Sequence, residues 1–258
     1  MRRKEIIVQG LKTSYWQQGN QEKIPLICLP GWLTPGSVYE KALDFLSDYL
    51  ILEWPGFGLS QKPPQVWGIE DYASFLREFL EKLGIKKCIL LGHSFGGSVA
   101  IYFAAHNPRI VEKLILVASS GIRRRSRKER VKLFFWRWLA KLLKIFLFWL
   151  PLKVKRRWRR KMMRWLGSDD YLTEGIMREI YRRIIQKDLQ AEMKRISSPT
   201  ILLWGEKDDS TPLSEGRLTA QLISGAKLKI IPRAGHFPFR DNYQSWRRFL
   251  ESALSECI

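Results

Sequence analysis

The sequence predicts an α/β protein in which helices flank a mainly parallel central sheet and a helical cap is inserted into the core. Two observations support this prediction. Short apolar runs alternate with helical patterns along most of the 258 residues, which is typical of a parallel sheet with right-handed crossovers. The composition changes after Gly121 and recovers only at Ser197, so we expect a core of residues 1–121 and 197–258 and a cap of residues 122–196.

The predicted strands begin with an antiparallel pair around Gly10 and continue as continuously apolar runs, the pattern of strands buried on both faces. In chain order they are Glu5–Val8, Leu11–Gln17, Ile24–Leu29, Tyr49–Glu53, Ile89–Leu91, Leu114–Ala118, Pro199–Trp204 and Lys227–Ile231. Helices are predicted where apolar residues recur at intervals of three and four. These helices are Glu70–Leu83, Ser98–Ala105, Leu213–Ile223 and Tyr243–Leu254.

The most informative motif, Gly92 to Gly97, lies between a predicted strand and a predicted helix. In that context Gly-x-Ser-x-Gly is typical of a nucleophile elbow, a sharp turn that exposes a serine. Glycine at positions 92 and 96 avoids the collisions that side chains would make in so tight a turn. Taken alone the motif also fits a glycine-rich turn with an incidental serine, so the interpretation of Ser94 depends on the rest of the chain.

A nucleophilic serine needs a neighbouring base, and histidine is the usual base near neutral pH. Of the three histidines, His93 adjoins Ser94 on the elbow, so its ring is expected to point away from the serine hydroxyl. His106 ends the following helix, roughly 18 Å away at about 1.5 Å per residue. His236 remains, and its position after a predicted strand places it at the carboxyl edge of the sheet.

A carboxylate is expected to orient the histidine and to stabilise its charged form. The segment Trp204–Pro212 follows a predicted strand and carries Glu206, Asp208 and Asp209. Spacing favours Asp208, but position alone leaves Asp209 open. A loop rich in aspartate is also an ordinary turn.

In this order the motifs resemble the α/β-hydrolase superfamily, in particular its capped serine carboxylesterases and lipases. The resemblance covers nearly the whole chain except the insertion, through Leu29–Trp32, Pro55–Ser60, Gly92–Gly97, Trp204–Pro212 and Gly235–His236. It implies an α/β-hydrolase fold with Ser94, Asp208 and His236 as the catalytic triad. It also implies an oxyanion hole formed by the backbone N–H groups of Trp32 and Phe95.

Two positions depart from the pattern of the family. Pro30 precedes Gly31 where the family usually has a histidine that braces the loop, so this change bears on the rigidity of the oxyanion hole. Glu53 replaces the usual aspartate before the Pro-Gly-Phe-Gly loop, which is a milder change. The dehalogenase and epoxide-hydrolase branches need an aspartate at the position of Ser94, so this residue argues against both.

The formal charge of +20 is concentrated in the insertion. Residues 122–165 contain 18 Lys or Arg and one acid, Glu129, a net charge of +17. One predicted helix has a cationic stripe of Arg130, Arg137, Lys141 and Lys144, and the rest of its circumference, from residues between 133 and 149, is apolar and aromatic. A second, over 154–166, places Val154, Trp158, Met162 and Trp165 on one face. The charges interrupt every long apolar run, so no membrane span is predicted.

Three interpretations of the cap are open. Its apolar face covers the acyl pocket while its charges are solvated, or it rests as a peripheral lid on an anionic membrane surface. In the third interpretation it binds an acidic protein of the acyl-carrier type. Substrate-binding residues are expected between Ile122 and Ile196. Nucleic acid is not expected as a partner, because no recognised module accompanies the charge.

The cysteines and the first residues bear on cofactors and location. Cys28, Cys88 and Cys257 form an odd set without metal-binding spacing, which favours buried free thiols, and we expect no metal and no cofactor. The apolar stretch Ile6–Val8 is too short for a signal peptide or a membrane span. We therefore expect a cytoplasmic protein, peripheral on the inner face of the membrane if the cap binds lipid.

The sequence thus predicts a serine hydrolase that cleaves acyl esters with an apolar chain through an acyl-enzyme. The same triad also serves acyltransferases and carbon–carbon hydrolases, and no residue in the sequence decides among these reactions. A non-catalytic, membrane-surface binding protein that kept the scaffold is the alternative from another class.

Overall fold

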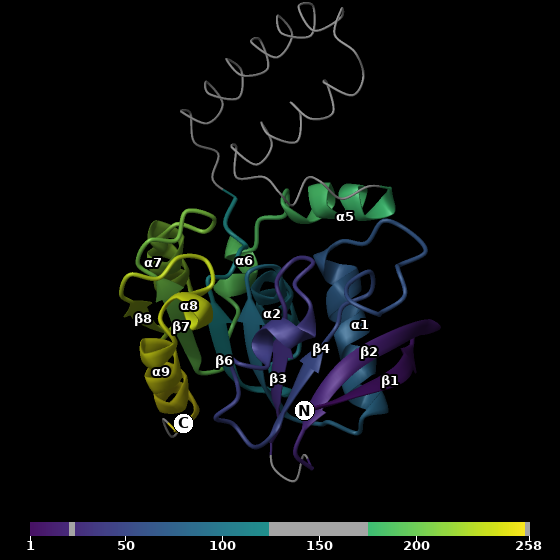
Figure 1. Ribbon diagram of the computed structural model, residues 1–258. Coiled ribbons are helices and arrows are strands. Elements are labelled where there is room, and N and C mark those ends of the chain that lie inside the picture. The colour runs from purple at the N-terminus through teal and green to yellow at the C-terminus, as the bar shows by residue number, and fades with distance from the viewer. Residues whose placement is uncertain (21–23, 124–174, 256–258) are drawn as a thin grey trace, which may run out of the picture.

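The computed structural model describes residues 1–20, 24–123 and 175–255 (Figure 1). Its strands are β1 (Arg2–Val8), β2 (Leu11–Gln18), β3 (Leu26–Leu29), β4 (Tyr49–Leu52), β5 (Cys88–His93), β6 (Val111–Val117), β7 (Thr200–Gly205) and β8 (Lys227–Ile231). Within the described residues they form one eight-stranded sheet in the order β1-β2-β4-β3-β5-β6-β7-β8. β2 pairs antiparallel with β1 and with β4, and the other pairings are parallel.

Helices cover both faces of this sheet (Figure 1). They are η1 (Gly36–Tyr39, a 3₁₀ helix), α1 (Ile69–Lys82), α2 (Phe95–His106), α5 (Ile176–Ile184), α6 (Gln190–Met193), α7 (Leu213–Leu222), α8 (Pro238–Asp241) and α9 (Tyr243–Ser255). One face packs against α1, α2, α6 and α7 in a single apolar core. The opposite face packs against η1, α8 and α9 in a second core. The predicted α/β fold class, with its mainly parallel sheet, is therefore confirmed.

The predicted elements occur in the predicted order, and their ends differ in instructive ways. β6 begins at Val111, three residues before the predicted start at Leu114. The prediction began too late because the charged residue Lys113 interrupts the apolar pattern. Lys113 is buried in the structure, and its ammonium donates to the carbonyl oxygen of Ala253 at 2.8 Å, near the carboxyl end of α9. Lys113 is thus a strand residue whose charge is stabilised by carbonyl oxygens at the C-terminus of a helix. Periodicity of the apolar residues alone does not reveal such a contact.

The described end of the insertion contacts the core at the carboxyl edge of the sheet. Figure 1 shows α5 lying across this end of the molecule. Its Tyr181 ring lies 5.2 Å from the Trp32 ring, and Arg183 donates to the carbonyl oxygen of Val66 at 3.0 Å. Farther along, Leu189 and Met193 are buried in the same core as α2. The two predicted cap helices, one with the cationic stripe from Arg130 to Lys144 and one over 154–166, lie outside the described residues.

Two further predictions concern the described part of the chain. Cys28 and Cys88 are buried free thiols, as predicted, whereas Cys257 lies outside the described residues. Burial raises the pKa of the Cys88 thiol to about 12, which keeps it protonated and unreactive at neutral pH. None of the helices described here is both long enough and apolar enough to cross a membrane.

Candidate active site

Ser94 occupies a strained turn between β5 and α2. Its backbone has φ 51° and ψ −115°, a conformation that L-residues rarely adopt and that costs of order 1–3 kcal/mol. The turn requires glycine, since a Cβ at Gly96 would lie 2.0 Å from the carbonyl oxygen of Leu29. A Cβ at Gly92 would lie 2.7 Å from the carbonyl oxygen of Gly96. The motif therefore forms the predicted elbow, with Ser94 at the positive end of the α2 dipole.

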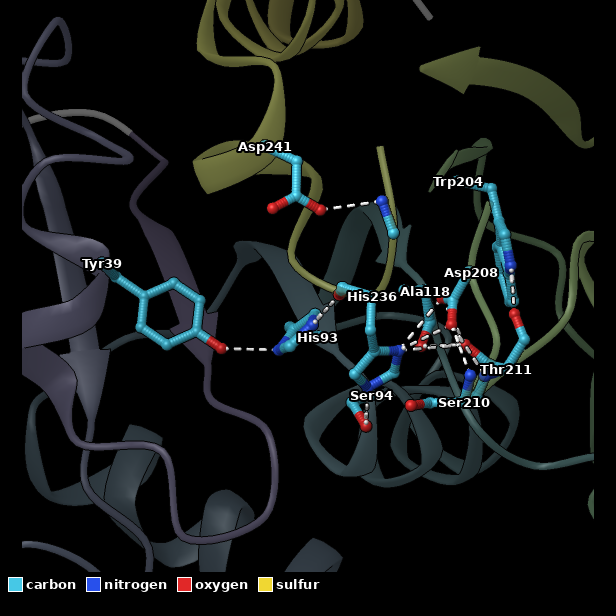
Figure 2. Close-up of polar contacts among 11 residues, drawn as sticks. Tyr39, His93, Ser94, Ala118, Trp204, Asp208, Ser210, Thr211, His236 and Asp241 are labelled. Atoms are coloured by element: carbon cyan, nitrogen blue, oxygen red, sulfur yellow. Dashed lines mark hydrogen bonds and ion pairs between the residues drawn. The ribbon is translucent and has the colours of Figure 1, made fainter. Parts of the chain in front are cut away.

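The three residues predicted as a triad lie together at the carboxyl edge of the sheet (Figure 2). His236 Nε2 lies 3.0 Å from Ser94 Oγ, and His236 Nδ1 lies 3.0 Å from Asp208 Oδ2. A carboxylate can only accept, so Nδ1 carries the proton of the neutral ring and Nε2 is free to accept from the serine hydroxyl. This tautomer is the one with which a histidine can take the proton of an attacking serine.

Asp208 is buried and held by several donors besides His236. The hydroxyl of Thr211 donates to Asp208 Oδ2 at 2.8 Å, and the backbone N–H groups of Ser210 and Thr211 donate to Oδ1, each at 2.9 Å. Burial by itself would raise the pKa of the Asp208 carboxyl, but the His236 hydrogen bond and charge and the Thr211 donors bring it below its ordinary value. Ser94, His236, Asp208 and Thr211 are called the serine network below.

The alternative acid, Asp209, does not reach the histidine. Its side chain is exposed, whereas Asp208 points inward from the same loop. The loop that carries His236 is fixed separately, because the backbone N–H of Gly235 donates to Asp241 Oδ2 at 2.7 Å. Gly205 permits this close approach, since a Cβ there would lie 2.1 Å from the carbonyl oxygen of Gly235. The backbone contacts of both loops thus place Asp208 and His236 within hydrogen-bond distance of each other.

The other two histidines have different surroundings, as the sequence predicted. His93 is 1% exposed, and its Nδ1 lies 2.8 Å from the Tyr39 hydroxyl. Its Nε2 lies 2.9 Å from the backbone carbonyl oxygen of His236. Both ring nitrogens are therefore engaged away from Ser94 (Figure 2). His106 lies at the end of α2 on the surface, where its ring stacks on Tyr102.

The predicted oxyanion-hole residues are neighbours. The rings of Trp32 and Phe95 contact each other edge to face, with centroids 5.5 Å apart. Within the described residues, neither the backbone N–H of Trp32 nor that of Phe95 donates to another backbone group. The preceding loop is braced without a histidine at position 30: Trp54 Nε1 donates to the Pro30 carbonyl oxygen at 3.1 Å, and the Gly31 N–H donates to the Tyr39 hydroxyl at 3.1 Å.

Glu53, the second departure from the family pattern, links several loops behind this site. Its carboxylate accepts from Trp16 Nε1 at 3.1 Å and from the backbone N–H of Leu59 at 3.2 Å. A Cβ at Gly58 would lie 2.5 Å from Glu53 Oε2, so the glutamate packs directly against the backbone of that loop. The longer side chain therefore keeps a loop-bracing function.

A cavity of about 180 Å³ lies beside the serine network. Its lining includes Thr211, which contacts Asp208, and Ser98, one turn along α2 from Ser94. The remaining wall combines a few polar groups, among them Lys187 and Glu215, with the aliphatic residues Ile69, Ile122, Ile184, Ile185 and Leu189. Several of these residues come from the predicted cap segment 122–196. No cluster of three His, Cys, Asp or Glu side chains suited to a metal ion occurs among the described residues.

Three residues that make hydrogen bonds around the site were not singled out from the sequence. Thr211 was part of a recognised motif, and a hydroxyl three residues after an aspartate is a common turn signal that could have indicated its hydrogen bond to Asp208. Tyr39 and Trp54 carry no such signal. Their partners lie far away in sequence, 54 residues for the Tyr39–His93 contact and 24 for Trp54–Pro30.

Comparisons with known proteins identify the family and the fold of the chain. Residues 26–249 match the model of the "Alpha/beta hydrolase family". The hydrolase YugF of Bacillus subtilis is 26% identical over 255 residues, covering 90% of each chain. The solved structure of a bacterial membrane phospholipase A is similar with a TM-score of 0.75 at 21% identity, covering 98% of this chain and 87% of the other. A meta-cleavage product hydrolase, CumD, gives a TM-score of 0.70 at 22% identity, covering 98% of each chain.

Proposed function

The chain belongs to the alpha/beta hydrolase family and is a hydrolase, and from this premise we propose that it is a serine hydrolase that cleaves acyl esters with an apolar chain. The observation that supports the proposal most directly is the pair of 3.0 Å contacts that His236 makes with Ser94 Oγ and Asp208 Oδ2. A hydroxyl, an imidazole and a carboxylate in this order activate a serine for attack on a carbonyl carbon.

In the proposed reaction, Ser94 Oγ attacks the ester carbonyl while His236 Nε2 takes the hydroxyl proton. The carbonyl oxygen becomes an oxyanion that accepts hydrogen bonds from the N–H groups of Trp32 and Phe95, at about 3 kcal/mol for each donor. The intermediate collapses, and the departing alkoxide takes the proton from His236 and leaves as an alcohol. A water molecule then attacks the acyl-enzyme by the same steps, which releases the carboxylic acid and restores Ser94.

The cavity beside the serine network has room for a substrate group of limited size, and its lining is polar on one part and aliphatic on another. Its volume is about 180 Å³, and a cavity of about 150 Å³ lined by aliphatic side chains can bind one benzene molecule. The aliphatic wall from Ile69, Ile122 and Ile184 suits the hydrocarbon part of an ester. The solved structures named above act on different substrates and resemble this chain only in fold, so they do not decide the substrate.

The charge of the insertion favours a place of action at an anionic membrane surface on the inner face of the membrane. Residues 122–165 carry a net charge of +17 and many aromatic residues, a composition that suits the interface of an anionic lipid layer. An ester substrate dissolved in or released from such a layer would meet the active site beneath the cap. An acidic acyl-carrier-type protein would bind the same charge.

The first test is a panel of nitrophenyl esters of increasing chain length, with wild-type protein and Ser94→Ala. We expect the wild type to prefer short to medium chains and the variant to lose about 10⁶-fold in kcat. A fluorophosphonate should label wild-type Ser94 stoichiometrically. Hydrolysis by Ser94→Ala at the wild-type rate would overturn the proposed mechanism.

The second test is sedimentation with liposomes. Binding to anionic liposomes is expected at low salt and should weaken at high salt, whereas neutral liposomes serve as the control. No sedimentation with anionic liposomes at low salt would remove the membrane proposal. Binding to an acyl carrier protein in place of liposomes would assign the basic surface to a protein partner.

A further inference from the structure

A second set of hydrogen bonds lies next to the serine network and connects the two loops on which the proposed reaction depends. The Gly31 N–H donates to the Tyr39 hydroxyl at 3.1 Å, the hydroxyl lies 2.8 Å from His93 Nδ1, and His93 Nε2 lies 2.9 Å from the His236 carbonyl oxygen. These groups of Gly31, Tyr39, His93 and His236 are called the tyrosine network. Figure 2 shows its Tyr39, His93 and His236 members side by side.

For a neutral His93 ring, the chemistry of the end groups allows one arrangement of protons. A backbone N–H can only donate, so the Tyr39 hydroxyl accepts from Gly31 and gives its own proton to His93 Nδ1. A carbonyl oxygen can only accept, so His93 donates to His236 through a protonated Nε2. With the His93 imidazole neutral, each donor in the network therefore meets an acceptor.

Burial keeps this arrangement intact. Tyr39 is 0% exposed and His93 is 1% exposed, and the rings of Phe237 and Phe239 lie 5.1 and 5.3 Å from the His93 ring. Burial, together with the neighbouring His236, lowers the pKa of His93 to about 3. Burial also raises the pKa of Tyr39 well above its ordinary value, so its hydroxyl stays a donor.

One end of the network holds the backbone that directly precedes the Trp32 amide. The C=O of Gly31 and the N–H of Trp32 belong to one planar peptide unit. That unit is held by the bond from the Thr34 N–H to the Gly31 carbonyl oxygen, at 3.1 Å. The Gly31 N–H belongs to the preceding peptide unit, which is held by the Tyr39 hydroxyl at 3.1 Å and, at the Pro30 carbonyl oxygen, by Trp54 Nε1 at 3.1 Å. The backbone of Gly31 is thus fixed on both sides of its Cα, which limits rotation of the Trp32 amide. The side chain of Pro30 has no polar group with which to do this, so Tyr39 supplies the hydrogen bond.

The other end holds the backbone of His236. His93 binds the His236 carbonyl oxygen at 2.9 Å, and Asp241 binds the preceding Gly235 N–H at 2.7 Å. The backbone is thus fixed on both sides of the residue whose imidazole faces Ser94.

We propose that Tyr39 and His93 are positioning residues that hold the Trp32 amide and the His236 imidazole in register for catalysis. The inference rests on the proposed function, because it assigns these residues to the acyl-transfer geometry of that site. Neither side chain would touch substrate. Their effect is to link the loop of Gly31 to the loop of His236, 205 residues apart in the sequence. With a neutral His93 ring, the linking side chains have only one hydrogen-bonding arrangement.

The test compares Tyr39→Phe with Tyr49→Phe. For each variant, kcat is calculated per active site, and the concentration of active sites is determined by titrating Ser94 with a fluorophosphonate. Tyr49 is also a buried tyrosine, but its hydroxyl lies 3.9 Å from Met1 Sδ, at the amino end of β4 and away from the site. For Tyr39→Phe we expect kcat to fall about 10- to 100-fold with KM nearly unchanged, because small displacements of catalytic groups cost about this much. Tyr49→Phe should retain wild-type kcat.

Two further readouts separate positioning from simple destabilisation. The inhibition constant of a trifluoromethyl ketone, which forms a tetrahedral adduct, should rise in parallel with the loss of kcat. His93→Gln, whose amide can both accept and donate, should retain more activity than His93→Phe. Unchanged kcat per titrated site in Tyr39→Phe, or equal losses in the two His93 variants, would overturn the proposal.

Failure of the proposed function would be recognised separately. If wild-type protein neither hydrolyses the ester panel nor takes up fluorophosphonate, the serine hydrolase assignment fails. The tyrosine network is then tested by NMR, because the ¹⁵N chemical shifts of the His93 ring report which of its nitrogens is protonated. They should report a neutral ring protonated at Nε2 between about pH 5 and pH 8. A His93 ring protonated at Nδ1, or one that titrates in this range, would overturn the network independently of any activity.

Discussion

The serine network and the tyrosine network lie side by side and are built from similar groups, but they end differently. Each contains a histidine, and the two rings are 5.1 Å apart. The tyrosine network ends at two backbone groups, the Gly31 N–H and the His236 carbonyl oxygen, so each of its donors is satisfied. The serine network ends at the hydroxyl of Ser94, and the side chain of His236 is 18% exposed.

This difference shows how one residue type serves two purposes at one edge of a sheet. His93 is closed in by Tyr39 and by aromatic rings, so burial favours its neutral form and it can act only as a brace. His236 has Asp208 on one side and a reactive hydroxyl on the other, so its charged form is stabilised when it takes a proton. The surroundings, and not the distance to Ser94 in the sequence, distinguish the proposed base from the proposed brace.

The largest expected effect comes from exchanging the two histidines for glutamine, one at a time. His236→Gln should lower kcat about 10⁶-fold, because it removes the proton acceptor of the serine. His93→Gln should lower kcat by at most about 100-fold, because it alters only the positions of other groups. Steady-state kinetics on a nitrophenyl ester provide the measurement. A greater loss in His93→Gln than in His236→Gln would reverse the assignment of base and brace.

The next effect concerns the two adjacent aspartates. Asp208→Asn should lower kcat about 10⁴-fold, since the amide no longer stabilises the tautomer and charge that His236 needs. Asp209→Asn is the matched control, because Asp209 is exposed, and it should behave as wild type. Both variants can be assayed on the same ester. Loss of activity in Asp209→Asn of comparable size would mean that the carboxylate has been assigned to the wrong residue.

A third prediction uses pH to expose the buried histidine. The pKa of His93 is lowered from 6.5 to about 3 in the folded protein, so the unfolded state binds more protons below about pH 6.5 and stability falls as the pH falls. The slope from this group approaches about 1.4 kcal/mol per pH unit. Above about pH 5 the lowered pKa values of Asp208 and Glu70 contribute little, and comparison with a variant that lacks the His93 ring isolates its contribution.

The measurement is denaturant unfolding of the wild type and of His93→Gln between about pH 6.5 and pH 5. The variant should lose less stability over this interval than the wild type, even if it is less stable at neutral pH. Parallel curves for the two proteins would show that the His93 ring is not kept neutral by the fold.

The smallest expected effect is at Thr211. Thr211→Val removes the hydroxyl that donates to Asp208 Oδ2, so the carboxylate loses one stabilising partner and kcat should fall about tenfold. Thr211→Ser keeps the hydroxyl and should retain most of the activity. The comparison is made at a pH where wild-type activity is constant. Equal activity in the valine and serine variants would show that the hydroxyl does not contribute.

Much of the fold and part of the site followed from the sequence. Strands such as Lys227–Ile231 are continuous apolar or amphipathic runs between turn residues, and local patterns of this kind depend on near neighbours only. The elbow was recognisable as a local motif, although the need for glycine at position 96 arises from the carbonyl oxygen of Leu29 on the neighbouring strand β3. His236 followed because only three histidines were available and two had unsuitable positions.

The tertiary structure alone decided which groups meet across long separations. It places Asp208 inward and Asp209 outward, although the two are adjacent and chemically identical. It also joins Tyr39 to His93 across 54 residues and His93 to the backbone of His236 across 143. Such contacts depend on strand register, loop path and side-chain rotamer together, and a hydrogen bond tolerates errors of only a few tenths of an ångström. The residue types of the serine network were therefore readable in the sequence, whereas the brace beside it became visible only in the folded chain.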